Sequence, residues 1–103
     1  MLNIVAIITA KPGKRDEVLA AFNANVPAVH AEKGCVEYAA VVDAPDMGPF
    51  QTKLGPDSFA VIEKWESQED LMAHAVSDHM KEYGKKTKDL VADKAIHILT
   101  AAE

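Results

Sequence analysis

The order of strand-like and helix-like patterns constrains the fold of this 103-residue chain more than any other feature. Continuous β-branched or apolar runs bounded by Gly, Pro or Asp indicate strands, and apolar residues recurring about every 3.6 positions indicate helices. The patterns predict strands at residues 3–10, 35–43, 58–65 and 95–101, and helices at residues 13–34 and 68–91. The predicted order is therefore β-α-β-β-α-β.

This order is typical of the ferredoxin-like, split βαβ plan, an α+β fold. Two right-handed crossovers would place both helices on one face of a four-stranded antiparallel sheet. The length suits one domain over residues 1–103. Pro27 predicts a kink or break in the first helix, and Ser77-Asp78 marks a candidate interruption of the second, where the serine can cap a new piece.

The first and last predicted strands are apolar on both faces, whereas a sheet covered by helices on one face should carry polar residues at alternate positions on the other. The first strand has Ile4, Ala6 and Ile8 on one face and Val5 and Ile7 on the other. The last strand has Ile96 and Ile98 on one face and Ala95 and Leu99 on the other. Leaving four or five such side chains in water would forgo roughly 1.5 to 3 kcal/mol each, a total comparable to the stability of a small domain. We therefore expect a homodimer in which a second copy covers the open sheet face.

Charge and composition exclude several classes of partner. The net charge of −5 disfavours nucleic acid and anionic membrane surfaces. No apolar run approaches the ~20 residues of a membrane helix, and the N-terminal residues lack the features of a signal peptide. A single cysteine, Cys35, forbids an internal disulfide, so we expect a cytoplasmic protein. No glycine-rich dinucleotide or phosphate motif is present, so no flavin or nicotinamide cofactor is expected.

The stretch from Ser58 to Tyr83 is the candidate site, because its predicted strand ends on the only tryptophan, Trp65, and its helix carries two of the four histidines. His74 and His79 are five residues apart, so a continuous helix would rotate them about 140° from each other. They therefore do not form the i,i+4 pair that chelates zinc, and the sequence predicts no protein-bound metal.

Other residues of this stretch fit either a protein core or the wall of a pocket for a flat, apolar ligand. His79 and Tyr83 share a helix face, and the neighbouring stripe is apolar, with Met72, Val76 and Met80. Glu63 lies on the same side of its strand as Trp65, so it must be at the rim or hydrogen-bonded to a partner such as a histidine. Tyr38 on the second strand is more often a core residue than a ligand. The 14-residue segment 44–57 is long for a loop, and it carries Met47 and Phe50.

The segments EKGCVEY and SFAVIEKWESQEDLMAHAVSDHM resemble the antibiotic biosynthesis monooxygenase superfamily, within it the bacterial quinol monooxygenases. The resemblance implies a ferredoxin-like homodimer that forms a dimeric α/β barrel-like assembly. It also implies a reaction without metal, flavin or haem, in which a deprotonated quinol or other polyhydroxy-aromatic substrate passes an electron to O2. The roles implied are His74 or His79 as base, Trp65 as ring-packing wall, Tyr83 and Tyr38 as donors, and Phe50 with Met47 as a lid.

Two departures and two alternatives accompany this interpretation. No asparagine lies on the tryptophan-bearing strand, and His74 stands near the position of the tryptophan of the haem-degrading members, which disfavours haem cleavage. The first alternative is an isomerase of a small phosphorylated sugar on the same fold, which would need a cationic phosphate site. The end of the second helix could supply one with Lys81, Lys85, Lys86 and Lys88, although such a run is also typical of a solvated helix end. The third hypothesis is a non-catalytic dimeric ligand-binding or stress-associated protein.

Overall fold

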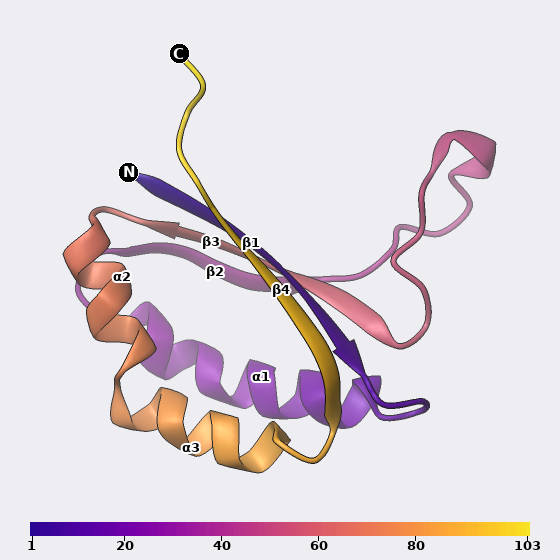
Figure 1. Ribbon diagram of the computed structural model, residues 1–103, viewed down its shortest axis with the longest axis horizontal. Helices are drawn as coiled ribbons and strands as arrows, with labels where there is room; N and C mark the ends of the chain where they lie inside the picture. The colour runs from indigo at the N-terminus through magenta and orange to yellow at the C-terminus, as the bar shows by residue number, and fades with distance from the viewer.

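The computed structural model describes all 103 residues and contains one four-stranded sheet with its helices on one side (Figure 1). The strands run in the order β2-β3-β1-β4, and every neighbouring pair is antiparallel. The elements in chain order are β1 (Leu2–Ala10), α1 (Arg15–His30), β2 (Cys35–Val41), the 3₁₀ turn η1 (Gly48–Phe50), β3 (Ser58–Trp65), α2 (Gln68–Ala75), α3 (Asp78–Thr87) and β4 (Val91–Leu99). The predicted ferredoxin-like α+β fold is confirmed.

The core lies between the sheet and α1. Alternate residues of β1 are buried, and the antiparallel register places Ile4, Ala6 and Ile8 opposite Glu63, Val61 and Phe59 on the same face. Val18, Phe22 and Val29 of α1 pack against this face with at most 1% of their surface exposed. The 3.6-residue period of the α1 sequence is therefore the period of its buried stripe.

Two helix predictions need correction, and one is confirmed. The first helix runs unbroken through Pro27 and ends at His30, earlier than the expected Gly34. Pro27 lies in the last turn, where its missing N–H removes one hydrogen bond while Val29 still packs in the core. The expected interruption of the second helix exists, because α2 ends at Ala75 and α3 begins at Asp78.

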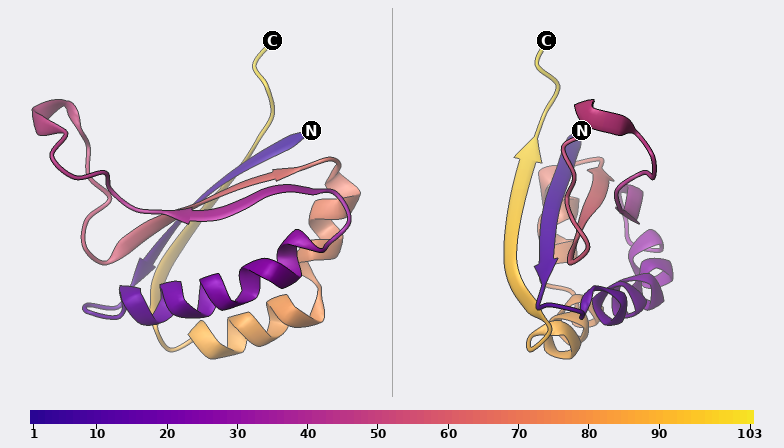
Figure 2. Two further views of the ribbon diagram at one scale, coloured as in Figure 1. Left: turned by 180° about the vertical axis from the view of Figure 1, so that it is seen from behind. Right: turned by 90° about the vertical axis from the view of Figure 1, so that its right-hand side faces the viewer.

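The last strand begins four residues earlier than expected, at Val91 rather than Ala95, and it ends at Leu99. Val91 pairs with Ala10 across a register shift in β1. Ile96 and Ile98 stand opposite Ala6 and Ile4, on the helix-facing side of the sheet, yet they are 60% and 59% exposed because the helices do not extend over β4. On the opposite face, Val5 and Ile7 pair with Ile62 and Ala60 and have no helix above them (Figure 2).

The β2–β3 loop projects from the end of the sheet opposite to α2 (Figure 1). Its neck is held by Asp43, whose carboxylate accepts the backbone N–H groups of Leu54 and Gly55 at 2.8 and 2.9 Å, and these hydrogen bonds lower the pKa of Asp43. At its tip Phe50 is 86% exposed. None of the helices is long and apolar enough to cross a membrane.

Candidate functional site

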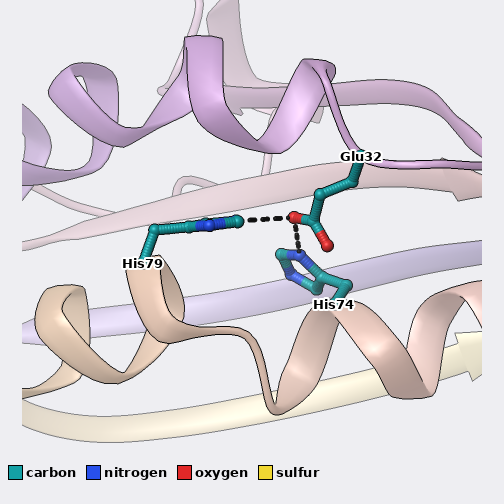
Figure 3. A group of neighbouring side chains, drawn as sticks. All are labelled: Glu32, His74 and His79. Atoms are coloured by element: carbon teal, nitrogen blue, oxygen red, sulfur yellow. Dashed lines mark hydrogen bonds and ion pairs between the residues drawn. The ribbon is translucent and has the colours of Figure 1, made fainter.

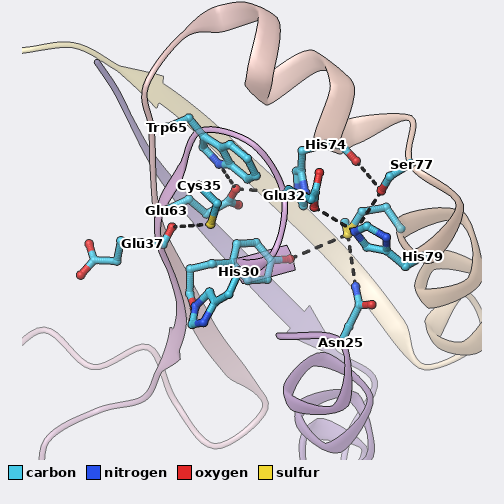
Figure 4. Close-up of polar contacts among 12 residues, drawn as sticks. Asn25, His30, Glu32, Cys35, Glu37, Glu63, Trp65, His74, Ser77 and His79 are labelled. Carbon is cyan, nitrogen blue, oxygen red and sulfur yellow. Dashed lines mark hydrogen bonds and ion pairs between the residues drawn. The ribbon is translucent and has the colours of Figure 1, made fainter. Parts of the chain in front are cut away.

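Five side chains meet where β3 ends and α2 joins α3, and we call them the histidine–glutamate cluster: Glu32, Glu63, Trp65, His74 and His79 (Figure 4). The break between the two helices creates it. The hydroxyl of Ser77 donates to the carbonyl oxygen of His74 at 2.9 Å and so ends α2, and the chain turns before His79 begins the next helix.

Glu32 is the centre of this cluster. It lies in the turn after α1, and a single carboxylate oxygen, Oε2, is 2.7 Å from Nδ1 of His74 and 2.8 Å from Nε2 of His79 (Figure 3). A carboxylate only accepts, so each ring nitrogen must donate its proton to it. This arrangement fixes the tautomer of each neutral imidazole, with Nε2 of His74 and Nδ1 of His79 as the free nitrogens. A carboxylate that orients a histidine in this way is the usual support of a general base.

His74 is buried against aromatic rings. Its ring centroid lies 4.7 Å from that of Trp65 and 5.4 Å from that of Tyr38. The apolar space expected beside Trp65 is therefore filled by His74 itself, and the tryptophan is fully buried. The indole Nε1 of Trp65 donates to Oε1 of Glu63 at 2.9 Å, and that oxygen is 3.9 Å from Nε2 of His74.

The cluster contains two acidic side chains but no lysine or arginine. The side chains of Glu32 and Glu63 are 14% and 11% exposed, and neither forms an ion pair with a lysine or arginine. Burial raises the pKa of Glu63, and the charge of Glu32 raises it further, against the opposing effects of the Trp65 hydrogen bond and of His74. Burial and then the two carboxylates also raise the pKa of the Cys35 thiol. Negative charge in this interior is thus balanced only by imidazole and indole N–H groups.

A cavity of about 210 Å³ between α1 and α3 reaches the edge of the cluster. It is lined by Ala24, Asn25, His79, Glu82, Tyr83 and Lys86. The side chain of His79 is 30% exposed, whereas that of His74 is 5% exposed. In this conformation a ligand in the cavity therefore meets His79 and not His74.

The two tyrosines keep their protons at neutral pH. Burial raises the pKa of Tyr83 to about 12, and burial, helped by the charge of Glu63, raises the pKa of Tyr38 beyond that range. Tyr38 is buried, stacks on Phe22 with centroids 4.9 Å apart, and directs its hydroxyl to the sulfur of Met80 at 3.9 Å. Tyr83 lines the cavity and remains available as a hydrogen-bond donor.

Several predicted site residues lie away from the cluster. Met72 is 56% exposed and Val76 is 63% exposed, so the predicted apolar stripe is not continuous with Met80, because the helix break turns α2 relative to α3. Met47 and Phe50 lie on the projecting loop at the far end of the sheet, and the structure does not place them over this chain's own Trp65.

Comparisons with known proteins identify the family of the chain. Residues 1–86 match the family described as antibiotic biosynthesis monooxygenase. The chain belongs to this family. It is 42% identical over 101 residues to the Escherichia coli K12 protein named "Probable quinol monooxygenase YgiN", with 96% of each chain covered, and it is equally similar to the Shigella flexneri protein of that name.

Solved structures show the same fold. A Pseudomonas aeruginosa protein matches with a TM-score of 0.81 at 25% identity, over 99% of this chain and 94% of the other. A Mycobacterium tuberculosis protein matches with a TM-score of 0.80 at 20% identity, over 99% and 95%. The matched residues cover almost the whole of this chain, so these proteins share its fold.

The phosphorylated-sugar alternative gains no support from the lysines of α3. Lys85 pairs with Glu82 at 3.5 Å, and both side chains are largely exposed. Lys81, Lys85 and Lys88 surround a surface hollow that Asp78 and Glu82 also line. Acidic groups beside the lysines oppose phosphate binding, and the arrangement is that of a solvated helix.

Gly34 fixes the turn that carries Glu32 against α2. Its φ of +81° is left-handed, and a Cβ at this position would collide with the side chain of Asp70. We expect Gly34→Ala to lower the free energy of unfolding by at least about 2 kcal/mol, because backbone strain of about 1–2 kcal/mol is added to the collision. Urea denaturation measures this loss.

Gly13→Ala is the matched control for the Gly34 variant. Gly13 has a φ of +77°, and no atom lies within 4 Å of the point that an alanine methyl group would occupy there. This control therefore carries the backbone strain without the collision. An equal loss of stability in both variants would contradict the role of the Asp70 contact.

Proposed function

We propose that the chain is a cofactor-independent monooxygenase that oxidises a quinol or another polyhydroxy-aromatic substrate with O2. The observation that carries the proposal is the pair formed by Glu32 and His79 at the wall of the cavity between α1 and α3. The family membership and the name of the Escherichia coli relative support the same reaction class.

In this proposal His79 is the general base. Glu32 and the hydroxyl of Ser77 hold Nε2, at 2.8 and 3.2 Å, so Nδ1 is the nitrogen that takes a phenolic proton. Tyr83 donates a hydrogen bond to a substrate oxygen. His74, locked between Trp65 and Glu32, positions the carboxylate and is not the base. The cavity is smaller than the ~300 Å³ of typical ligand sites, which favours a small flat ring.

The chemistry balances without a cofactor. Loss of a proton to His79 makes the quinol an electron-rich anion, which gives one electron to O2. The resulting radical pair forms a carbon–oxygen bond, and cleavage of the O–O bond leaves one oxygen on the ring and releases the other as water. One quinol and one O2 thus become one hydroxyquinone and one water.

The test is O2 consumption with a series of hydroquinones, each compared with its spontaneous oxidation. The proposal predicts enzyme-dependent O2 uptake with incorporation of ¹⁸O from ¹⁸O2 into the quinone. Stoichiometric hydrogen peroxide without incorporation would indicate a simple oxidase. Tight quinone binding with no turnover would favour the non-catalytic hypothesis.

We also propose that the protein is a cytoplasmic homodimer in which a second copy covers the open sheet face. The half-buried side chains of Val5, Ile7 and Ile62 and the 46% exposed Leu99 of β4, all on this face, support it. Light scattering during size-exclusion chromatography should give twice the mass of one chain. Ile7→Glu should shift the protein to monomer, whereas Glu69→Gln on the far side should not; a well-folded monomer of the unaltered chain would contradict the proposal.

A further inference from the structure

The two largely buried carboxylates of the histidine–glutamate cluster, Glu32 and Glu63, have no lysine or arginine partner. Charged groups this deep are normally paired with lysine or arginine or coordinate a metal ion, because removal from water is costly. Glu32 and Glu63 have neither lysine nor arginine within ion-pair distance. Their partners are two imidazoles and one indole N–H.

The same residues present a set of donor atoms suited to a transition metal. One carboxylate oxygen of Glu32, Nδ1 of His74 and Nε2 of His79 all lie within 4.8 Å of one another. Two imidazoles and one carboxylate are a common protein ligand set for Zn²⁺, with a fourth position open to water or ligand. In the structure Oε2 lies between the two nitrogens, at hydrogen-bond distance from both (Figure 3). Rotation of this carboxylate out of the line between them makes room for an ion that replaces the two N–H protons.

We propose that Glu32, His74 and His79 form a binding site for a divalent transition-metal cation, of which Zn²⁺ is the best match.

The proton on each donor nitrogen can move to the other nitrogen of the same imidazole ring when the metal binds. When Nδ1 of His74 binds the metal, its proton moves to Nε2, which faces Oε1 of Glu63 at 3.9 Å. A carboxylate behind a metal-bound histidine is the usual outer-shell arrangement. When Nε2 of His79 binds, its proton moves to Nδ1. Each imidazole can therefore bind the ion by changing tautomer.

The ion would act as an inhibitor of the proposed reaction and not as its cofactor. A protonated Nδ1 on His79 no longer accepts a phenolic proton, so the base is lost when the site is filled. This consequence rests on the proposed function, whereas the binding site itself does not.

Binding is tested on the full-length chain after treatment with EDTA. Calorimetric titration with Zn²⁺ should give one ion per chain with a Kd of about 1 μM or tighter. Co²⁺ should give the intense visible absorption of a four-coordinate site, a readout that needs no variant. Glu32→Gln and His79→Ala should weaken binding by more than the roughly 10- to 100-fold that loss of an outer-shell partner costs. Glu69→Gln is the control, because Glu69 lies exposed on α2 away from the open sheet face, and it should bind as the unaltered chain does.

Three results would overturn the site. They are no binding below about 100 μM, a weak six-coordinate Co²⁺ spectrum, and an equal loss of affinity in Glu69→Gln; the last would indicate an adventitious ion only. Measuring quinol oxidation with and without Zn²⁺ distinguishes the metal site from the proposed metal-free reaction. If the EDTA-treated chain oxidises quinol and Zn²⁺ inhibits it at the occupancy measured by calorimetry, both stand. If Zn²⁺ binds but the EDTA-treated chain is inactive until metal is added, the site stands and the metal-free reaction is wrong.

Discussion

Replacing His79 with alanine should lower the rate of enzyme-dependent quinol oxidation about 10²- to 10⁴-fold, the contribution of a positioned general base. The fold should survive, because the side chain is 30% exposed and lies at the start of α3. Steady-state O2 consumption measures the loss, and circular dichroism checks the fold. Glu69→Gln, at an exposed position of α2 outside the cavity and the open sheet face, is the control and should leave the rate unchanged.

The role of Glu32 makes this prediction sharper. If the carboxylate acts by orienting His79, Glu32→Gln should lower kcat in the chain that has His79 and change little in the chain that lacks it. Gln keeps the size of the side chain and one oxygen, so the packing of His74 is retained. Additive losses in the double variant would mean that Glu32 and His79 act separately. An unaltered rate in His79→Ala would move the base to His74 or remove catalysis from this cluster.

The fold could be predicted from sequence because its signals are local. The β-branched run of β1, the helical period of Val18, Phe22 and Val29, and the serine at the helix break each determine structure within a few residues. The early start of β4 was missed for the opposite reason. Ala92, Asp93 and Lys94 show no apolar alternation, because this edge strand is exposed on both faces and is held by pairing with β1.

The site was only partly predictable because its central contact is tertiary. Glu32 and His74 are 42 positions apart, and no periodicity connects them. A continuous helix would point His74 and His79 in different directions, whereas the break at Ser77 brings both to one carboxylate. The sequence predicts this break at Ser77-Asp78. An interrupted helix does not fix the rotation between His74 and His79, so the break was the available signal that the two side chains could meet. The Glu-x-Gly segment before β2 was the other available signal, because Gly34 closes the turn that presents Glu32.

Trp65→Ala should be the most destabilising single change in the chain. The side chain is fully buried and belongs to the hydrophobic core, and truncation of such an aromatic residue costs about 3–5 kcal/mol. The change also removes the donor to Glu63 and leaves that carboxylate without its closest partner, which adds about 1–3 kcal/mol. The total approaches the roughly 5–15 kcal/mol that holds a typical domain together, so we expect an unfolded or barely folded chain at physiological temperature.

The variant Trp65→Phe separates the loss of buried volume from the loss of the hydrogen bond to Glu63. Phenylalanine fills most of the cavity but cannot donate to Glu63, so this variant should lose about 1–3 kcal/mol and remain folded. Urea denaturation at one protein concentration measures each loss, because the stability of an oligomer depends on concentration. Met72→Ala, at a side chain that is 56% exposed on α2, is the surface control. A loss of under about 1 kcal/mol in Trp65→Ala would mean that neighbouring side chains collapse into the space, and that His74 does not depend on the indole for its position.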